Sequence, residues 1–416
     1  MVFTMRSELK DLKSKLEQFM RDHIYPNEFE IMEFSENNPN QIHPLIEELK
    51  SKAKQQGLWN LFISNEYGSY SLGLSNLDYA YLAEVMGRVP WSSEVFNCNA
   101  PDTGNMEVLM KYGSDEQKET WLKPLLNGNI RSAFLMTEPH VASSDARNIS
   151  TKIVREGNEY VINGRKWWVT NAGHPNCSVF ILMGLTDSNA PSFEQQSMIL
   201  IPKNQKGVEM IRPLTALNSF DYPGGHWEIN LKNVRVPASN IILGEGKGFA
   251  IAQGRLGPGR IHHCMRLIGM AQRTLEYMIK RVEERTVFSR SLDKYSSVRQ
   301  TIANAYCSIE QARLLTLKAA HKIDTKGIKE AKDLIAAIKV VAPRMTCNIV
   351  DEAIQLFGGM GVSNDIPLAL FYTAARALRI ADGPDEVHLY QLGRNLIKQG
   401  VEDKEGELNY FTKDVN

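Results

Sequence analysis

The sequence predicts an α+β multidomain protein: an N-terminal helical domain, a middle antiparallel β domain and a C-terminal four-helix bundle. Three observations support this class. Apolar residues keep helical spacing up to about residue 131, alternate as in strands at about 132–243, and form long helical seams at 244–400. A chain of 416 residues also exceeds the length that one hydrophobic core usually serves.

The N-terminal domain, residues 1–131, is predicted to contain several helices. The first carries apolar residues at helical spacing and ends before Pro26: Leu9, Leu12, Leu16 and Phe19. Further helices are expected at residues 42–57, 76–87, 104–112 and 115–128.

The middle domain, residues 132–243, changes to the period of strands. Asn163-Gly164 lies between two apolar runs and predicts a hairpin turn, because both residues tolerate positive φ. Short apolar strands are expected at 179–183 and 198–201, and Trp227, Ile229 and Leu231 alternate as in a half-buried strand. We therefore expect a β sandwich or barrel.

The C-terminal domain, residues 244–400, shows apolar seams in alternating steps of four and three, which must pack on one another. Three long helices carry these seams, at residues 264–282, 298–312 and 335–349. Pro343 should kink the third helix. Residues 401–416 are charged, short of apolar anchors, and expected to form a loose tail.

Composition excludes several classes of function. Lys+Arg and Asp+Glu number 48 each, so the basic excess of a nucleic-acid binder is missing. No apolar run approaches the roughly 18 residues of a transmembrane segment. The five cysteines are scattered and read as buried or half-buried thiols of a reducing compartment. No HExxH motif or ligand cluster predicts a metal site.

Asp382 lies at a break between two predicted helices, in Ala381-Asp382-Gly383-Pro384-Asp385. One interpretation is that its carboxylate caps the helix that begins near Asp385, since aspartate favours that position. The alternative is that the break points the carboxylate into a cleft. Local sequence alone favours the cap.

Several motifs follow one another in an order that resembles the acyl-CoA dehydrogenase family of flavoproteins over nearly the whole chain. They are Phe134-Leu135-Met136-Thr137-Glu138-Pro139, Lys166-Trp167-Trp168-Val169-Thr170-Asn171, Glu284-Arg285-Thr286-Val287-Phe288 and Gln355-Leu356-Phe357-Gly358-Gly359. The likeness is nearest to the branch whose dehydrogenase unit is often fused to a phosphotransferase-like domain, on segments such as 254–264 and 381–388. We expect a stand-alone dehydrogenase unit here.

The resemblance implies a reaction and its partners. A carboxylate removes the pro-R α-proton of a fatty acyl-CoA, the β-hydride passes to flavin N5 of FAD, and trans-2-enoyl-CoA is formed in fatty acid β-oxidation. The electrons would go to electron-transfer flavoprotein. A medium to long or branched acyl chain is expected, and a homotetramer or dimer follows if FAD is bound across an interface.

The resemblance also implies individual site residues. Met136 and Thr137 would lie against the isoalloxazine, Trp168 and Thr170 would cover its other face, and Arg285 would bind the FAD of a neighbouring subunit. The full cofactor-binding set is Phe134, Met136, Thr137, Trp168, Thr170, Arg285, Phe288, Gln355, Gly358, Gly359 and Glu386. From the local sequence alone, Trp168 would be interpreted as a core aromatic residue, and Gly358 and Gly359 as the end of a helix.

The base and the substrate contacts are implied in the same way. Asp382 falls where most of the family has its catalytic glutamate, and Gly259 occupies the alternative position, which cannot supply a base. A base in a water-poor pocket should have a raised pKa. The substrate set is Ser144, Gly259, Arg260 and Gly383. Many members of the family have an acidic residue at the position of Gly257. The glycine implies room for longer or substituted acyl chains here.

Other interpretations stay open. The Asp-for-Glu exchange supports a catalytically weak acyl-CoA-binding or sequestering flavoprotein. An acyl-CoA oxidase, or a relative of the DNA-damage-linked flavoproteins, shares the architecture. The resemblance implies the mitochondrial matrix, but the N-terminal residues are no clear leader, so cytoplasmic and peroxisomal locations stay open.

Overall fold

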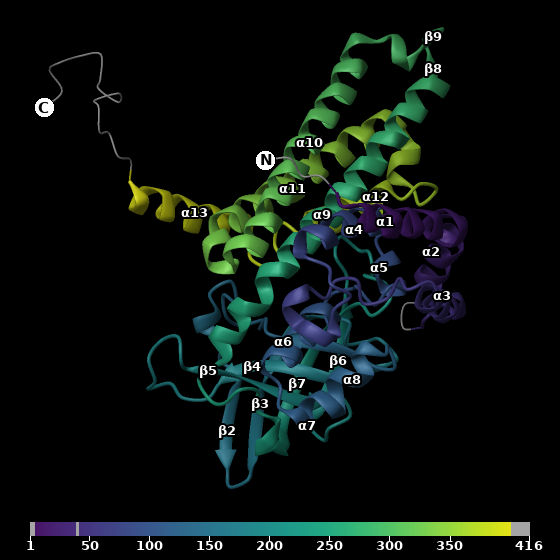
Figure 1. Ribbon diagram of the computed structural model, residues 1–416. Helices are drawn as coiled ribbons and strands as arrows, with labels where there is room; N and C mark the ends of the chain where they lie inside the picture. Colours follow the sequence, from purple (N-terminus) through teal and green to yellow (C-terminus); the bar gives the residue numbers. More distant parts are fainter. Residues whose placement is uncertain (1–4, 39–40, 401–416) are drawn as a thin grey trace, which may run out of the picture.

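A computed structural model describes residues 5–38 and 41–400 of the chain. The β domain lies at one end of the molecule, the long C-terminal helices extend away from it, and the N-terminal helices pack beside both (Figure 1). The predicted tail at 401–416 and the first four residues lie outside the described residues.

The N-terminal domain is helical, as predicted. Its helices are α1 Ser7–Phe19, α2 Glu28–Asn37, α3 Pro44–Gln55, α4 Asn76–Met86, α5 Ser92–Val95, α6 Asp102–Tyr112, α7 Asp115–Gln117 and α8 Lys123–Leu126. The sequence did not predict α2 and α5. In α2 the only buried apolar residue is Ile31, so its helical period is weak. The four residues of α5 are all buried and too short to show a period.

The middle domain is a sheet whose described strands are β1 Arg131–Leu135, β2 Lys152–Glu156, β3 Glu159–Thr170, β4 Cys177–Leu185, β5 Gln196–Pro202, β6 Val208–Leu214 and β7 His226–Pro237. Their order is β1-β4-β2-β3-β7-β6, and β5 pairs with the other side of β4. Most pairs are antiparallel, as expected, but β4 runs parallel to β1 and, through the pair Lys152 and Leu185, to β2.

The predicted hairpin at Asn163-Gly164 is wrong. Strand β3 continues through both residues, and the turn lies earlier, at Gly157, where φ is +62°. Gly164 is needed for a different reason: a Cβ there would lie 2.3 Å from Thr151 Oγ1. The pairing with β7 also shifts register between Ile162 and Gly164, so the dipeptide marks a bulge.

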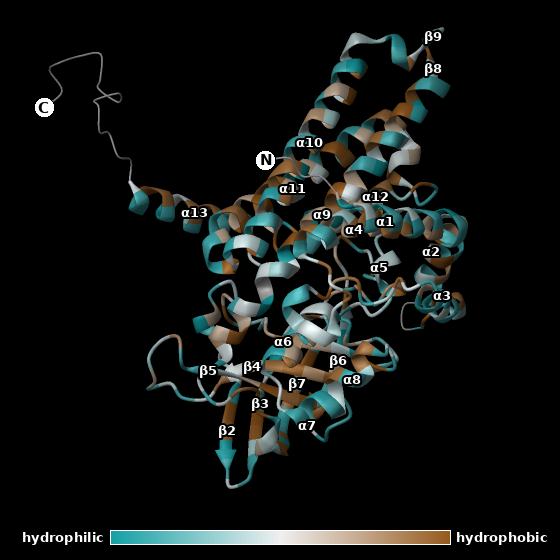
Figure 2. Ribbon diagram, viewed as in Figure 1, coloured by the Kyte–Doolittle hydropathy of each residue, from teal (hydrophilic) through white to brown (hydrophobic). Residues whose placement is uncertain are grey.

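Strand β4 is apolar from Val179 to Met183 because both of its faces are buried there. Val179, Ile181 and Met183 belong to the large core shared with the helical domains, whereas Phe180 and Leu182 belong to the core inside the β domain. Figure 2 shows the apolar strands gathered in the β domain. The sheet therefore joins two cores rather than standing apart from the helices.

The C-terminal domain is built on three long helices: α9 Gly248–Glu284, α10 Ser296–Lys326 and α11 Ile328–Phe357. All three predicted seams lie within them. A short hairpin, β8 Thr286–Val287 and β9 Arg290–Ser291, links α9 to α10. Two shorter helices follow, α12 Leu368–Ala377 and α13 Asp385–Gln399. Pro343 lies inside α11, which continues past it, and the kink stays a prediction.

Four of the five cysteines are buried, but Cys307 is exposed, contrary to the sequence-based expectation. It lies on a solvent-facing side of α10. Across residues 5–38 and 41–400, no helix is long and apolar enough to cross a membrane. The same residues contain no cluster of His, Cys, Asp and Glu suited to a metal ion.

Candidate active site

Asp382 lies in the short link between α12 and α13, in left-handed backbone with φ +56°, and Gly383 follows with φ +99°. The helix-cap interpretation is wrong, because Pro384 is the N-cap of α13 and no side chain caps that helix. A non-glycine residue with positive φ is strained, and such residues gather at functional sites. The break in the helical pattern is therefore a specific turn around Asp382.

Side chains from three other helices hold the main chain of this turn. Arg260 Nε of α9 and His388 Nε2 of α13 each donate a hydrogen bond to the Asp382 carbonyl at 3.2 Å. Lys339 Nζ of α11 donates to the carbonyl oxygens of Ala381 at 2.8 Å and Leu378 at 2.6 Å. The carbonyls on both sides of the Asp382 Cα are thus bound.

The carboxylate of Asp382 is left largely free. Its one ion-pair contact among the described residues joins Oδ2 to His263 Nε2 at 3.4 Å. The neighbouring Asp385 is different: its buried Oδ2 accepts from Arg344 Nε at 2.8 Å and Arg379 Nε at 2.9 Å. The Asp385 carboxylate is thus bound in hydrogen bonds that stabilise the fold. The Asp382 carboxylate, three residues earlier, keeps acceptor positions that a substrate proton could use.

The pKa of Asp382 differs from the expectation. Burial tends to raise the pKa of this carboxyl, but four neighbouring groups outweigh burial and lower the pKa below its ordinary value: His263, Arg255, Lys339 and Arg260. The predicted raised pKa is therefore wrong for this state of the protein. Sequence reasoning named Arg260 but missed His263, Arg255 and Lys339, because they lie on α9 and α11, far from Asp382 in the chain.

The segments predicted to face a flavin lie against each other. Trp167 N donates to Thr137 O at 3.0 Å. The fully buried Lys166 donates from Nζ to Met136 O at 2.9 Å, to Glu138 Oε1 at 2.8 Å and to Met183 O at 2.8 Å. Lys166 and Trp167 of β3 therefore hold the segment 136–138, which follows β1, against the strand β3.

Trp168 is not a core aromatic. Its side chain is 40% exposed and its φ is +52°. The pairing of β3 with β7 shifts register between Lys166 and Val169, and such a bulge turns a side chain away from the regular direction. The Trp168 ring lies 5.4 Å from that of His226, whose Nδ1 is 3.0 Å from Thr170 Oγ1. The exposed Trp168 and the half-buried Thr170 thus both contact His226.

Arg255 of α9 connects Phe134 with two carboxyl groups. Its guanidinium lies 4.0 Å from the centre of the Phe134 ring, and its Nε is buried without a hydrogen-bond partner among the described residues. Burial lowers the pKa of Arg255, while Asp382 and Glu107 act to raise it. The cation that lies over the Phe134 ring therefore also acts on the charge of Asp382.

Glu107 of α6 is 4% exposed, and burial raises its pKa to about 8, against the opposing effect of Arg255. The folded state thus holds a proton that the unfolded chain releases near the ordinary value of 4.5. From about pH 5 to about pH 8 this contribution to stability decreases as pH rises. We expect Glu107→Gln to remove that decrease, seen as melting temperature against pH.

The exposed Glu116 supplies the matched control, because Glu116→Gln should leave the shape of the wild-type curve unchanged. Parallel curves for wild type and Glu107→Gln would contradict the raised pKa.

Several predicted cofactor residues lie far from Asp382. Arg285 and the 98% exposed Phe288 are on the β8–β9 hairpin, at the opposite end of α9 from the β domain (Figure 1). Arg285 follows Arg260 by 25 residues, about 37 Å at the helical rise. Gln355, Gly358 and Gly359 are exposed at the end of α11, near the same end of α9, where Arg281 donates to Phe357 O.

The remaining predicted residues are placed as follows. Ser144 and Glu386 are exposed. Gly259 precedes Arg260, and a Cβ on it would meet nothing within 4 Å. Gly257 is buried, and a Cβ there would lie 3.0 Å from Ile328 of α11. The Ile328 side chain thus lies next to Gly257, and the room for longer or substituted acyl chains stays a prediction.

Sequence reasoning missed Lys166, Lys339, Glu107 and Arg255. A usable signal existed for Lys339 and Glu107: each is a charged residue inside an apolar run, Ile338-Lys339-Val340 and Met106-Glu107-Val108, whereas Lys166 follows Arg165 and gave no such signal. A charge at a buried position must be paired or functional. Arg255 lies among glycines and gave no such signal.

Family models match three successive parts of the chain. The N-terminal, middle and C-terminal domains of acyl-CoA dehydrogenase match residues 6–129, 133–234 and 246–397. These ranges together cover most of the chain.

Individual relatives agree. Acyl-CoA dehydrogenase family member 11 of Mus musculus is 50% identical over 400 residues, covering 94% of this chain and 51% of that protein, so the chain spans about half the length of that relative. Probable acyl-CoA dehydrogenase FadE2 of Mycobacterium tuberculosis is 51% identical, with 95% and 96% covered. The structure of a putative acyl-CoA dehydrogenase from Mycobacterium abscessus superposes with a TM-score of 0.93 at 48% identity, covering 96% of this chain and 100% of that chain.

Proposed function

The chain belongs to the acyl-CoA dehydrogenase family, and from that premise we propose that it dehydrogenates a fatty acyl-CoA with Asp382 as the base for the α-proton. One observation carries the assignment of the base. Arg260 and His388 bind the carbonyl of Asp382 and Lys339 binds that of Ala381, while the Asp382 carboxylate stays largely free. The Asp385 carboxylate, by contrast, is bound by two guanidinium groups.

In the proposed reaction the α-C–H bond of the acyl thioester breaks and the proton moves to a carboxylate oxygen of Asp382. The β-hydrogen leaves with its electron pair, and trans-2-enoyl-CoA results. Since the pKa of Asp382 is lowered, the carboxylate is ionised at neutral pH and ready to accept. A bound acyl chain would exclude water, and this further burial raises the pKa toward a more basic range.

The described residues fit FAD, the cofactor of the family. Trp168 offers an exposed indole face beside the Met136–Thr137 segment, and Lys166 and Trp167 hold that segment in place. FAD, when bound, supplies the hydride acceptor. We propose that Met136, Thr137, Trp168 and Thr170 hold its ring system and that Phe134 lies nearby. Glu386 is an exposed candidate on the first turn of α13.

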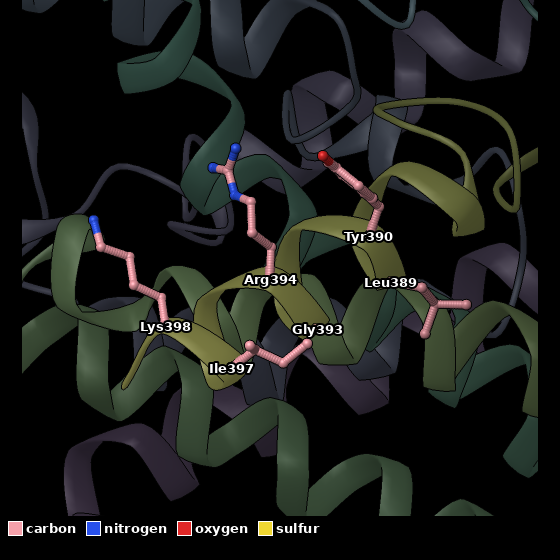
Figure 3. A pocket seen from close by; sticks show the side chains of 6 residues that line it. All are labelled: Leu389, Tyr390, Gly393, Arg394, Ile397 and Lys398. Carbon is pink, nitrogen blue, oxygen red and sulfur yellow. The ribbon is translucent and has the colours of Figure 1, made fainter. Parts of the chain in front are cut away.

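A homo-oligomer would complete this site. Arg285, Phe288, Gln355, Gly358 and Gly359 lie too far along the bundle to reach the same cofactor as Trp168, so we propose that they bind the FAD of neighbouring subunits. The exposed apolar side chains of α13 support association: Leu389, Tyr390 and Ile397 lie along one hollow on this helix (Figure 3). Their burial between subunits would be favourable.

The substrate and the partners are proposals at the level of the family. We propose a medium to long or branched acyl-CoA in fatty acid β-oxidation, with Arg260, Gly259, Gly383 and Ser144 on the substrate side. Electron-transfer flavoprotein is the proposed acceptor and the mitochondrial matrix the proposed location.

An anaerobic titration tests the proposed function. Acyl-CoA added to the FAD-loaded protein should bleach the visible flavin band and yield trans-2-enoyl-CoA. Binding without bleaching would favour the sequestering alternative. If bleaching occurs, reoxidation by electron-transfer flavoprotein identifies a dehydrogenase, and rapid reoxidation by oxygen identifies an oxidase.

A further inference from the structure

Lys339 is a buried lysine whose ammonium group is bound to the main chain just before Asp382. Its exposed fraction is 1%, and Nζ donates to Leu378 O at 2.6 Å and Ala381 O at 2.8 Å. Leu378 is the C-cap of α12, where carbonyl groups have no partner within the helix. Lys339 therefore ties the end of α12 to the peptide group that enters Asp382.

The turn needs this support, because left-handed backbone at a non-glycine residue persists only where the surroundings hold it. Arg260 and His388 bind the carbonyl after the Asp382 Cα, and Lys339 binds the carbonyl before it. These contacts come from α9, α13 and α11. The position of the Asp382 side chain is thus set through its backbone.

We propose that Lys339 is a positioning residue for proton abstraction, holding the turn so that the short Asp382 carboxylate reaches the α-proton. This inference rests on the proposed function. Hydrogen bonds to the carboxylate itself would stabilise its charge and weaken the base. Bonds to the adjacent carbonyls place the carboxylate and leave its lone pairs free.

An aspartate depends on such placement more than a glutamate would. Its side chain is shorter by one carbon–carbon bond, about 1.5 Å. For proton transfer the carboxylate oxygen must first lie within hydrogen-bonding distance of the α-carbon proton, whatever its pKa. The backbone at residue 382 must therefore lie closer to the substrate than it would for a glutamate. A lysine with a merely structural role would stabilise the packing of α11 against α12 without affecting proton transfer.

The test measures proton abstraction separately from hydride transfer. The probe is an acyl-CoA analogue with sulfur in place of the β-carbon, which has an α-proton but no β-hydrogen to transfer. Exchange of its α-hydrogen with D₂O is followed in the FAD-loaded protein. Lys339→Met should slow exchange by about tenfold to a hundredfold while the analogue Kd changes by less than about threefold.

The pH profile gives a second readout. Six groups from three helices interact electrostatically with Asp382: Arg255, Arg260, His263, Cys264, Lys339 and His388. Since Lys339 lowers the pKa of Asp382, its replacement by methionine should move the acidic limb of the exchange profile to higher pH. Lys339→Arg keeps the charge and the donors, so its profile should return most of the way to that of wild type.

Lys50 supplies a matched control: it is equally buried but pairs with Glu94 and Glu47, and it is not among the groups that act on Asp382. Lys50→Met should lower the melting temperature and leave the exchange profile unchanged.

The outcomes separate the inference from the proposed function. No exchange in wild type overturns the proposed function and the inference with it. Normal exchange and an unshifted profile in Lys339→Met overturn the inference alone. Lys339→Gln replaces the methionine variant if the latter does not fold, and failure of both to fold would show a structural lysine and reject the positioning role.

Discussion

Replacing Asp382 by asparagine should nearly abolish turnover while FAD stays bound. Asparagine keeps the size of the side chain and leaves the backbone contacts of Arg260, His388 and Lys339 in place. It cannot accept the α-proton. Loss of a general base costs about 10²–10⁴ in rate, so acyl-CoA should bleach the flavin more slowly by that factor. Stopped-flow absorbance under anaerobic conditions measures the effect.

Two variants control this result. Asp351→Asn removes an exposed carboxylate from α11 and should react like wild type. Asp382→Glu keeps a carboxylate, and it should be faster than Asp382→Asn because a base is still present. If Asp382→Asn bleaches within about threefold of wild type, another group abstracts the proton and the assignment fails.

Replacing Glu94 by glutamine should cause a large loss of stability. Glu94 is 1% exposed and joins the N-terminal domain to β1: its Oε1 accepts from Arg131 Nε at 2.9 Å and lies 2.7 Å from Lys50 Nζ. Glutamine removes the negative charge and leaves two buried cations without it. Breaking a buried pair in this way costs about 3–5 kcal/mol of unfolding free energy, measurable by denaturant titration.

The control for Glu94 is an exposed pair of the same kind. Glu119→Gln breaks the contact with Lys123, whose side chain is largely in water, and should cost less than about 0.5 kcal/mol. A Glu94→Gln protein as stable as Glu119→Gln would show that the buried pair contributes little to the joining of the domains.

The three domains could be predicted from the sequence because the spacing of apolar residues is set locally along the chain. The seams of α9, α10 and α11 repeat over many residues, and β4 shows a clear apolar run. The hairpin turn, which lies at Gly157 and not at Gly164, could not be located in this way. Whether a glycine is kept for positive φ or for close approach depends on its neighbour, and Thr151 lies in another segment.

The candidate site could be predicted in part. Motif order pointed to Asp382, and its left-handed turn and free carboxylate agree with a special role. The direction of its pKa could not be predicted, because it depends on Arg255 and Lys339, which approach through tertiary packing. The same holds for Lys166, whose three acceptors lie on two other segments of the β domain, the stretch after β1 and the strand β4.

The most direct test of Asp382 as the base compares α-hydrogen exchange in wild type and Asp382→Asn, using the sulfur-substituted acyl-CoA analogue in D₂O. No hydride transfer is possible with this probe, so exchange reports proton abstraction alone. We predict exchange in wild type and a rate lower by about 10²–10⁴ in Asp382→Asn, at similar analogue affinity. Equal exchange in both proteins would contradict the role of Asp382.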